Sequence, residues 1–185
     1  MIESIYYAIQ KVPKEFSFNK ALPNNILEYI NNKHGAKIKE SLFAWGLLNQ
    51  LINADLSKVT FLKSNKPILN GLSFSISHSK GYVAIAFCYQ PINLGIDIQK
   101  IEDKDLNFLS KLAKEFKAQD RNGQYHLWTK REATVKALNL KLLSNDLPKF
   151  KGVNNSVLTA DGEFSVSIYN DSELNLKEIS YEDYI

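Results

Sequence analysis

The sequence predicts an α+β fold of two similar halves, residues 1–92 and 93–185. A strand, then helices, then further strands occur twice in this order, and Pro91 lies where the second series begins. The 185 residues are 44% hydrophobic and include only 8 Gly, which suffices for one large domain or two small ones with a buried core. We therefore expect one α+β unit on each side of Pro91.

The first half begins with the aromatic, β-prone residues 6–9, which predict a strand. Residues 24–35 indicate a short helix that Gly35 closes. Residues 38–54 predict a longer helix with one buried face, because apolar side chains recur there at spacings of three and four. The apolar residues of this face are Ile38, Leu42, Trp45, Leu48 and Ile52.

Short apolar runs in the rest of the first half predict strands. These runs are residues 59–63, 67–69, 72–76 and 82–89. Gly71 and the polar cluster at residues 77–81 predict turns between them.

The second half begins with a strand at residues 94–98 and continues with two helices. The first helix, over residues 103–117, has apolar residues on one side and lysines largely on the other. The second, over residues 124–140, is rich in strong helix formers. Two or three strands follow, around Val157 and at residues 164–169 and 176–179.

Composition and charge narrow the function classes. The single cysteine, Cys88, excludes an intramolecular disulfide framework and any multi-cysteine metal site. Residues 1–16 lack the pattern of a signal peptide and no run of 18 apolar residues occurs, so we expect a cytoplasmic protein without a membrane partner. The net charge is +8 over residues 1–150 and −5 over residues 151–185. This balance suits an anionic small molecule, an acidic protein or nucleic acid alike.

Three short segments carry residue types that support chemistry. Ser77-His78-Ser79 combines hydroxyls, an imidazole and backbone N–H groups in an expected turn, which could receive a phosphate. Asp97 puts a carboxylate in an apolar strand, which is costly unless a partner or cation compensates it. Glu132 and Lys136 share one helix face with Trp128. The plain alternatives are an ordinary turn, a solvent-facing aspartate and an exposed helix ion pair.

Taken in order, these segments resemble the Sfp-type 4′-phosphopantetheinyl transferase family. Its members typically show a Gly-Lys-Pro element, a Ser-His-Ser strand end, an (I/V)-G-(I/V)-D strand and a W-(T/S)-x-K-E-A-x-x-K helix. The corresponding segments here are Asn65-Lys66-Pro67, Ser77-His78-Ser79, Leu94-Gly95-Ile96-Asp97 and residues 128–136. The resemblance covers roughly residues 37–138.

The resemblance implies a monomer with its active site in the cleft between two halves. The implied reaction moves the phosphopantetheine arm of coenzyme A to a serine of an apo acyl or peptidyl carrier protein and releases adenosine 3′,5′-bisphosphate. Mg²⁺ is the implied cofactor, with Asp97, Glu132 and Gln99 at the positions of its ligands. Glu132, or a metal-bound water near it, would take the proton of the serine, and Lys136 would bind the pyrophosphate and favour departure of the bisphosphate. The positions implied to bind coenzyme A are Lys37, Lys66, Ser77, His78 and Lys136, with Lys33 and Lys39 as alternatives to Lys37.

The departures from the family pattern support alternatives. Gln99 stands where many relatives carry a third acid, so a catalytically weak homologue that binds coenzyme A or a carrier protein is the first alternative. Asn65 replaces a glycine, a mild change if the backbone there has a positive φ. A nucleic-acid-binding domain, supported only by the basic charge of residues 1–150, is the second alternative, and we expect no nucleic-acid partner. The lysines of residues 103–117 could meet an acidic carrier protein or form a solvated helix face.

Overall fold

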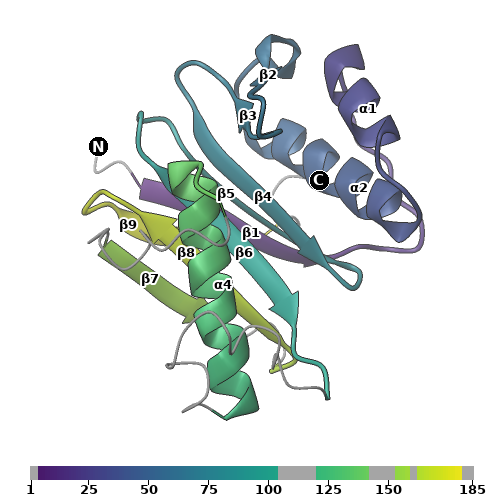
Figure 1. The fold of residues 1–185 in the computed structure, drawn as a ribbon. Helices are drawn as coiled ribbons and strands as arrows, with labels where there is room; N and C mark the ends of the chain where they lie inside the picture. Colours follow the sequence, from purple (N-terminus) through teal and green to yellow (C-terminus); the bar gives the residue numbers. More distant parts are fainter. Residues whose placement is uncertain (1–3, 104–119, 142–152, 159–161, 181–185) are drawn as a thin grey trace.

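The computed structural model describes residues 4–103, 120–141, 153–158 and 162–180. Within these ranges the fold is mixed α+β, with helices on the outside and sheets between them (Figure 1). The helices are α1 (Asn24–Asn31), α2 (Ala36–Leu51), the short 3-10 helix η1 (Leu56–Lys58) and α4 (Arg121–Leu138). The helix expected over residues 103–117 falls almost wholly outside the described residues.

The strands form two sheets and one hairpin. They are β1 (Ser4–Lys11), β2 (Thr60–Phe61), β3 (Pro67–Ile68), β4 (Ser73–Ser79), β5 (Tyr82–Cys88), β6 (Leu94–Lys100), β7 (Val153–Leu158), β8 (Phe164–Asn170) and β9 (Asn175–Glu178). The first sheet has the order β4-β5-β1-β9, the second has the order β6-β8-β7, and β2 pairs with β3. Because β9 pairs in parallel with β1, segments from both sides of residue 92 share the first sheet.

The two sheets face each other, with α2 on the outer face of the first and α4 on the outer face of the second. The sequence of β5 shows how the layers form, because this strand is apolar on both faces. Val83, Ile85 and Phe87 join the core beneath α2. Ala84, Ala86 and Cys88 face the second sheet, and their small side chains allow a close approach. Cys88 is fully buried, as expected for a small hydrophobic residue.

Helix α2 is buried on more sides than its spacing predicts. Trp45 and Leu48 are buried as expected, but Phe43 is also only 1% exposed. The cause is the segment before α1, whose Phe16 and Phe18 rings lie with their centroids 5.0 and 5.6 Å from that of Phe43. The expectation of a single buried face is therefore wrong, because a loop distant in sequence covers the second face.

The segment Ser77-His78-Ser79 lies in a strand rather than in a turn. All three residues belong to β4 and pair with β5, and the turn consists of Lys80 and Gly81, both with positive φ. The expectation of a turn at residues 77–79 is therefore wrong. The serine-rich sequence suggested a turn because Ser is common in turns, whereas here the serine hydroxyls have partners on another strand.

Those partners are backbone N–H groups of β6, which lies beside β4 although the strands belong to different sheets. The Oγ atoms of Ser75, Ser77 and Ser79 accept hydrogen bonds from the N–H groups of Ile96, Ile98 and Lys100 at 3.0, 3.3 and 3.1 Å. We call these three serines the serine ladder. Alternate residues of a strand point to the same side, so the ladder joins the two sheets along one edge.

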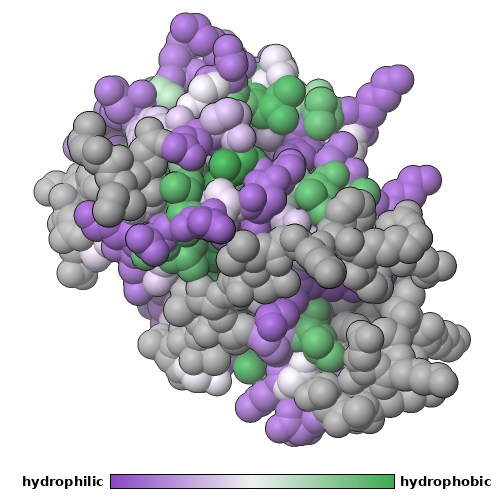
Figure 2. Space-filling view, turned by 90° about the vertical axis from the view of Figure 1, so that its left-hand side faces the viewer, coloured by the Kyte–Doolittle hydropathy of each residue, from purple (hydrophilic) through white to green (hydrophobic). Residues whose placement is uncertain are grey.

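None of the helices in the described part of the chain is both long and apolar enough to cross a membrane. On the face shown in Figure 2, hydrophobic residues appear as patches interrupted by hydrophilic ones.

Candidate functional site

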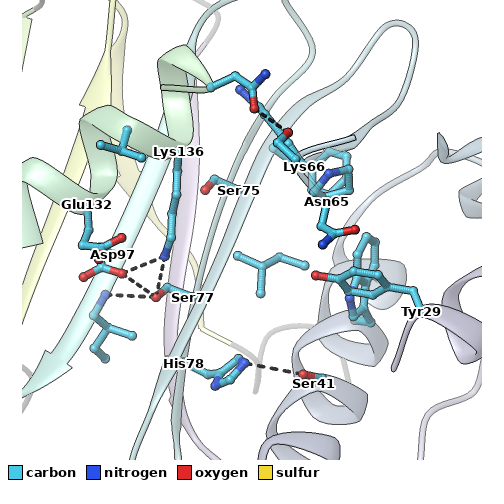
Figure 3. A pocket seen from close by; sticks show the side chains of 18 of the residues that line it. Tyr29, Ser41, Asn65, Lys66, Ser75, Ser77, His78, Asp97, Glu132 and Lys136 are labelled. Carbon is cyan, nitrogen blue, oxygen red and sulfur yellow. Dashed lines mark hydrogen bonds and ion pairs between the residues drawn. The ribbon is translucent and has the colours of Figure 1, made fainter. Parts of the chain in front are cut away.

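A cleft of about 510 Å³ lies over the serine ladder, between α2 on one side and α4 on the other (Figure 3). It brings together residues from five separate stretches of the sequence, in the α1–α2 region, the β2–β3 hairpin, β4, β6 and the end of α4. Of the residues singled out from the sequence, those that line it are Lys66, Ser77, His78, Asp97, Gln99, Glu132 and Lys136. Lys37 lines a neighbouring hollow instead, which the cleft meets at His78 and Gln99.

The close approach of α4 to β6 places the functional side chains of these elements together. A Cβ at Gly95 would lie 2.0 Å from the backbone oxygen of Ala133 and 2.8 Å from the nitrogen of Ala137, so only glycine fits there. The side chains of α4 that face β6 are correspondingly small, and two of them, Ala133 and Ala137, are buried alanines. The next face of the helix carries Glu132 and Lys136 into the cleft beside β6.

Asp97 is the centre of a buried polar group. Its side chain is on β6, 5% of the residue is exposed, and its Oδ1 lies 2.7 Å from Lys136 Nζ. Ser77 Oγ donates to the same carboxylate oxygen at 2.8 Å. The solvent-facing alternative for Asp97 is therefore wrong, because an ammonium and a hydroxyl compensate the buried charge.

Lys136 uses its whole donor capacity in this arrangement. Besides Asp97, its Nζ donates to Ser77 Oγ at 2.9 Å and to the carbonyl of Ile96 at 3.2 Å. An ammonium has three protons, so any further acceptor must replace one of these partners. The exposed ion pair within α4 considered as the plain alternative is not what forms, because Lys136 pairs with Asp97 on β6.

Glu132 lies half-buried next to this group and makes no hydrogen bond or ion pair with the described residues. Burial, followed by the repulsion of Asp97, raises the pKa of Glu132, and Lys136 and Arg131 only partly oppose this. Two carboxylates in one cleft with incomplete cationic compensation form a donor set that suits a hard divalent cation. The described residues contain no cluster of three or more His, Cys, Asp and Glu side chains. Gln99, two residues after Asp97 on β6, adds an amide to the lining of the same cleft.

The β2–β3 hairpin holds the C-terminal end of α4. Lys66 Nζ donates to the carbonyl of Ala137 at 2.6 Å, and Ser64 Oγ donates to Asn139 Oδ1 at 2.6 Å. Burial lowers the pKa of Lys66. Asn65 has a φ of 63°, so this residue adopts the left-handed conformation that Asn tolerates. Lys66 thus lines the cleft and donates a hydrogen bond to a backbone carbonyl at the C-terminal end of α4.

On the α2 side the cleft has a lysine among aromatic rings. Lys33 lines the cleft, with Nζ 4.8 Å from the centroid of the Tyr29 ring. Burial, and then the charges of Lys37 and Lys136, lower the pKa of Lys33. Trp45 and Trp128 also line the cleft, from opposite sides. The lysines favour an anionic ligand.

Sequence reasoning missed Glu40, which contacts His78. The Glu40 Oε2 atom lies 2.8 Å from His78 Nδ1, and only 8% of Glu40 is exposed. A signal was present in the sequence, because Glu40 precedes the buried Ala44, Leu47 and Leu51 at helical spacings of four, three and four. A charged residue at an apolar position of a helix indicates a partner elsewhere in the fold.

No protein-family model matches the chain, and no curated protein matches its sequence. A functional assignment therefore depends on the residues of the cleft, their geometry and the motif resemblance.

Proposed function

We propose that the chain is a 4′-phosphopantetheinyl transferase that uses coenzyme A and Mg²⁺ to modify a serine of an apo acyl or peptidyl carrier protein. The observation that carries this proposal is the grouping of Asp97, Glu132 and Lys136 in one cleft. Asp97 comes from β6 and the other two residues from α4, and each occupies the motif position that the resemblance assigns to catalysis or metal binding. The lysines of the cleft suit the phosphates of coenzyme A.

The donor set fits Mg²⁺, which prefers oxygen ligands and is commonly held by one or two carboxylates together with substrate phosphates. Asp97 and Glu132 would hold the ion, and Gln99 would offer its carbonyl oxygen or orient a water. When bound, Mg²⁺ would neutralise charge on the pyrophosphate of coenzyme A. Burial and then the charge of Asp97 raise the pKa of Glu132, and a bound cation would offset the second of these effects.

The proposed transfer is a displacement at phosphorus. The serine oxygen of the carrier protein forms a bond to the phosphorus that bears the pantetheine arm. The bond from that phosphorus to the bridging oxygen breaks, and adenosine 3′,5′-bisphosphate leaves with the electron pair. Glu132 accepts the serine proton. Lys136 exchanges one of its three partners for a pyrophosphate oxygen and stabilises the charge of the leaving group.

The positions of the helices support a two-half architecture of the family type, with residues 1–92 and 93–185 as the halves. Helix α2 packs on the first sheet and α4 on the second, and the cleft lies between the two helices. The serine ladder would then be the join between the halves.

One observation favours the alternative of a catalytically weak homologue. Gln99 lines the cleft where a third carboxylate would strengthen cation binding, so the site has one charge fewer than many relatives. Such a protein would bind coenzyme A without transferring the arm.

Intact-mass measurement of an apo acyl and an apo peptidyl carrier protein tests the proposal. Incubation with the protein, coenzyme A and Mg²⁺ is expected to add one phosphopantetheine to at least one carrier, and EDTA is expected to abolish the gain. Asp97→Asn is expected to lower the rate at least about 100-fold. Glu173→Gln, which changes an exposed carboxylate outside the cleft, serves as the matched control. No mass gain while coenzyme A still binds would favour the weak homologue.

A further inference from the structure

Glu40 is a buried carboxylate with two partners, and one of them belongs to the proposed site. From α2, its Oε1 accepts a hydrogen bond from the N–H of Gly81 at 2.6 Å. Its Oε2 lies 2.8 Å from Nδ1 of His78 on β4. One carboxylate oxygen therefore binds β4 and the other binds the β4–β5 turn, and Glu40 contacts only the Nδ1 side of the imidazole.

The chemistry of this contact fixes which nitrogen of His78 carries a proton. An ionised carboxylate can only accept hydrogen bonds, so Nδ1 must donate. Nε2 is left at the other side of the ring, 3.5 Å from Ser41 Oγ, and both residues line the cleft (Figure 3). A hydrogen bond at one ring nitrogen determines whether the other nitrogen carries a proton. Carboxylates fix the tautomer of catalytic and metal-binding histidines in this way.

We propose that Glu40 is a positioning residue that fixes the tautomer and orientation of His78, so that the imidazole can bind a phosphate group. Glu40 holds the Nδ1–H form of the ring and points Nε2 into the cleft, where Nε2 and a phosphate oxygen of the ligand share a proton. The carboxylate stabilises the positive charge that then develops on the imidazole. The inference rests on the proposed function for the identity of the ligand, which would be coenzyme A or its product.

The charged groups around His78 fit this arrangement. Glu40 on α2 is the acidic partner, while Lys33 on the α1–α2 connection and Lys136 on α4 approach the ring from the cleft side and oppose its positive charge. Burial is the first cause that lowers the pKa of His78 in the free protein. A phosphate that also meets Lys33 and Lys136 would remove their repulsion and leave the attraction of Glu40.

Glu40→Gln separates this role from a structural one. The amide keeps one oxygen for the N–H of Gly81, so the contact between α2 and the turn can persist. Its NH₂ group then faces His78 and donates to Nδ1, which moves the ring proton to Nε2. We therefore expect a folded variant with the opposite tautomer. Glu28→Gln, an exposed change on α1, is the matched control.

Two measurements on the full-length protein test the inference. Two-bond ¹H–¹⁵N spectra of the histidine rings are expected to show Nδ1–H for His78 in the wild type and Nε2–H in Glu40→Gln, with His78→Gln used for assignment. Calorimetric titration with adenosine 3′,5′-bisphosphate is expected to give a Kd about five- to tenfold higher for Glu40→Gln, since the neutral ring can still donate to the phosphate but no carboxylate stabilises an imidazolium beside it. In the transferase assay KM for coenzyme A is expected to rise while kcat stays within about twofold.

An Nε2–H tautomer in the wild type overturns the inference without reference to any variant. Equal bisphosphate affinity in the wild type and Glu40→Gln overturns it while leaving the transferase proposal intact. Failure of the wild type to bind the bisphosphate at all counts against both. The spectra report on the free protein, so they separate the two hypotheses.

Discussion

Glu132 is the residue at which stability and proposed function oppose each other. It is half-buried beside Asp97, and burial and this second carboxylate raise its pKa in the folded chain. In the unfolded chain the carboxyl is hydrated and ionises at its ordinary pKa, about 4.3. The folded state therefore binds the proton more tightly, and this contribution to stability is complete below about pH 4.3. It is lost as the pH rises through the raised pKa, so ionised Glu132 costs stability at neutral pH.

We expect Glu132→Gln to be more stable than the wild type at pH 7 and to have lost at least about 100-fold in transferase rate. The amide removes the charge that burial and Asp97 disfavour, but it cannot accept the serine proton. Urea unfolding at pH 4 and pH 7 checks the first part, and the stability gain is expected to shrink at pH 4. Glu173→Gln is expected to show no such gain at pH 7. A Glu132→Gln protein that is less stable than the wild type at pH 7 would contradict the explanation.

Single-residue reasoning from the sequence recovered most of the cleft but not the contacts within it. Asp97, Glu132 and Lys136 could be singled out because charged residues at apolar or regularly spaced positions are detectable in sequence. The sequence could not predict that Lys136 donates all three of its protons, because its partners Ser77 and the Ile96 carbonyl are on strands. Partners that are distant in sequence leave no local pattern.

At the scale of elements, the packing of α4 on β6 decides where the catalytic candidates lie. Gly95 lets the helix backbone reach the strand, and this distance sets the separation of Lys136 from Asp97. The helix was predictable from its strong helix formers and the strand from its short apolar run. Their contact was suggested only by the order of the motifs. The prediction of a turn at residues 77–79 was wrong for a related reason. The serine hydroxyls accept hydrogen bonds from β6, and this partner strand cannot be seen in the local sequence.

Gly95→Ala is expected to destabilise the protein by about 1–3 kcal/mol, because the new methyl group meets helix backbone that cannot move aside as a flexible side chain would. The transferase rate is expected to fall about 100-fold, since the displaced helix carries Glu132 and Lys136. Denaturant unfolding and the carrier mass assay measure these effects. Gly71→Asn is the control, because Gly71 has open space around its Cβ position and a φ that Asn tolerates. A fully active Gly95→Ala protein would show that the close contact does not set the site.

The whole molecule combines the two expected halves more closely than a boundary at residue 92 suggests. Strand β9 pairs with β1, and one face of the first sheet packs against the second, with Ile5, Ala84, Ile96 and Val166 in one core cluster. The α+β class was predictable from the order of elements. The pairing of β9 with β1 was not, because strand pairing between distant segments has no local sequence signature. A half on its own would expose an apolar sheet face.

The protein is therefore expected to unfold as one cooperative unit, and its two tryptophans can show this. Trp45 is buried in α2 and Trp128 lies on α4, so one ring reports on each side of the cleft. Trp45→Phe and Trp128→Phe proteins each retain a single fluorescent probe, and the urea midpoint seen by each ring is expected to match the one seen by circular dichroism of the same protein. Substitution shifts the midpoint of each variant, so coincidence is judged within a variant and not between them. A ring that unfolds well before the circular dichroism signal would show that its half opens independently, and the serine ladder and β9 would then be too weak to couple the halves.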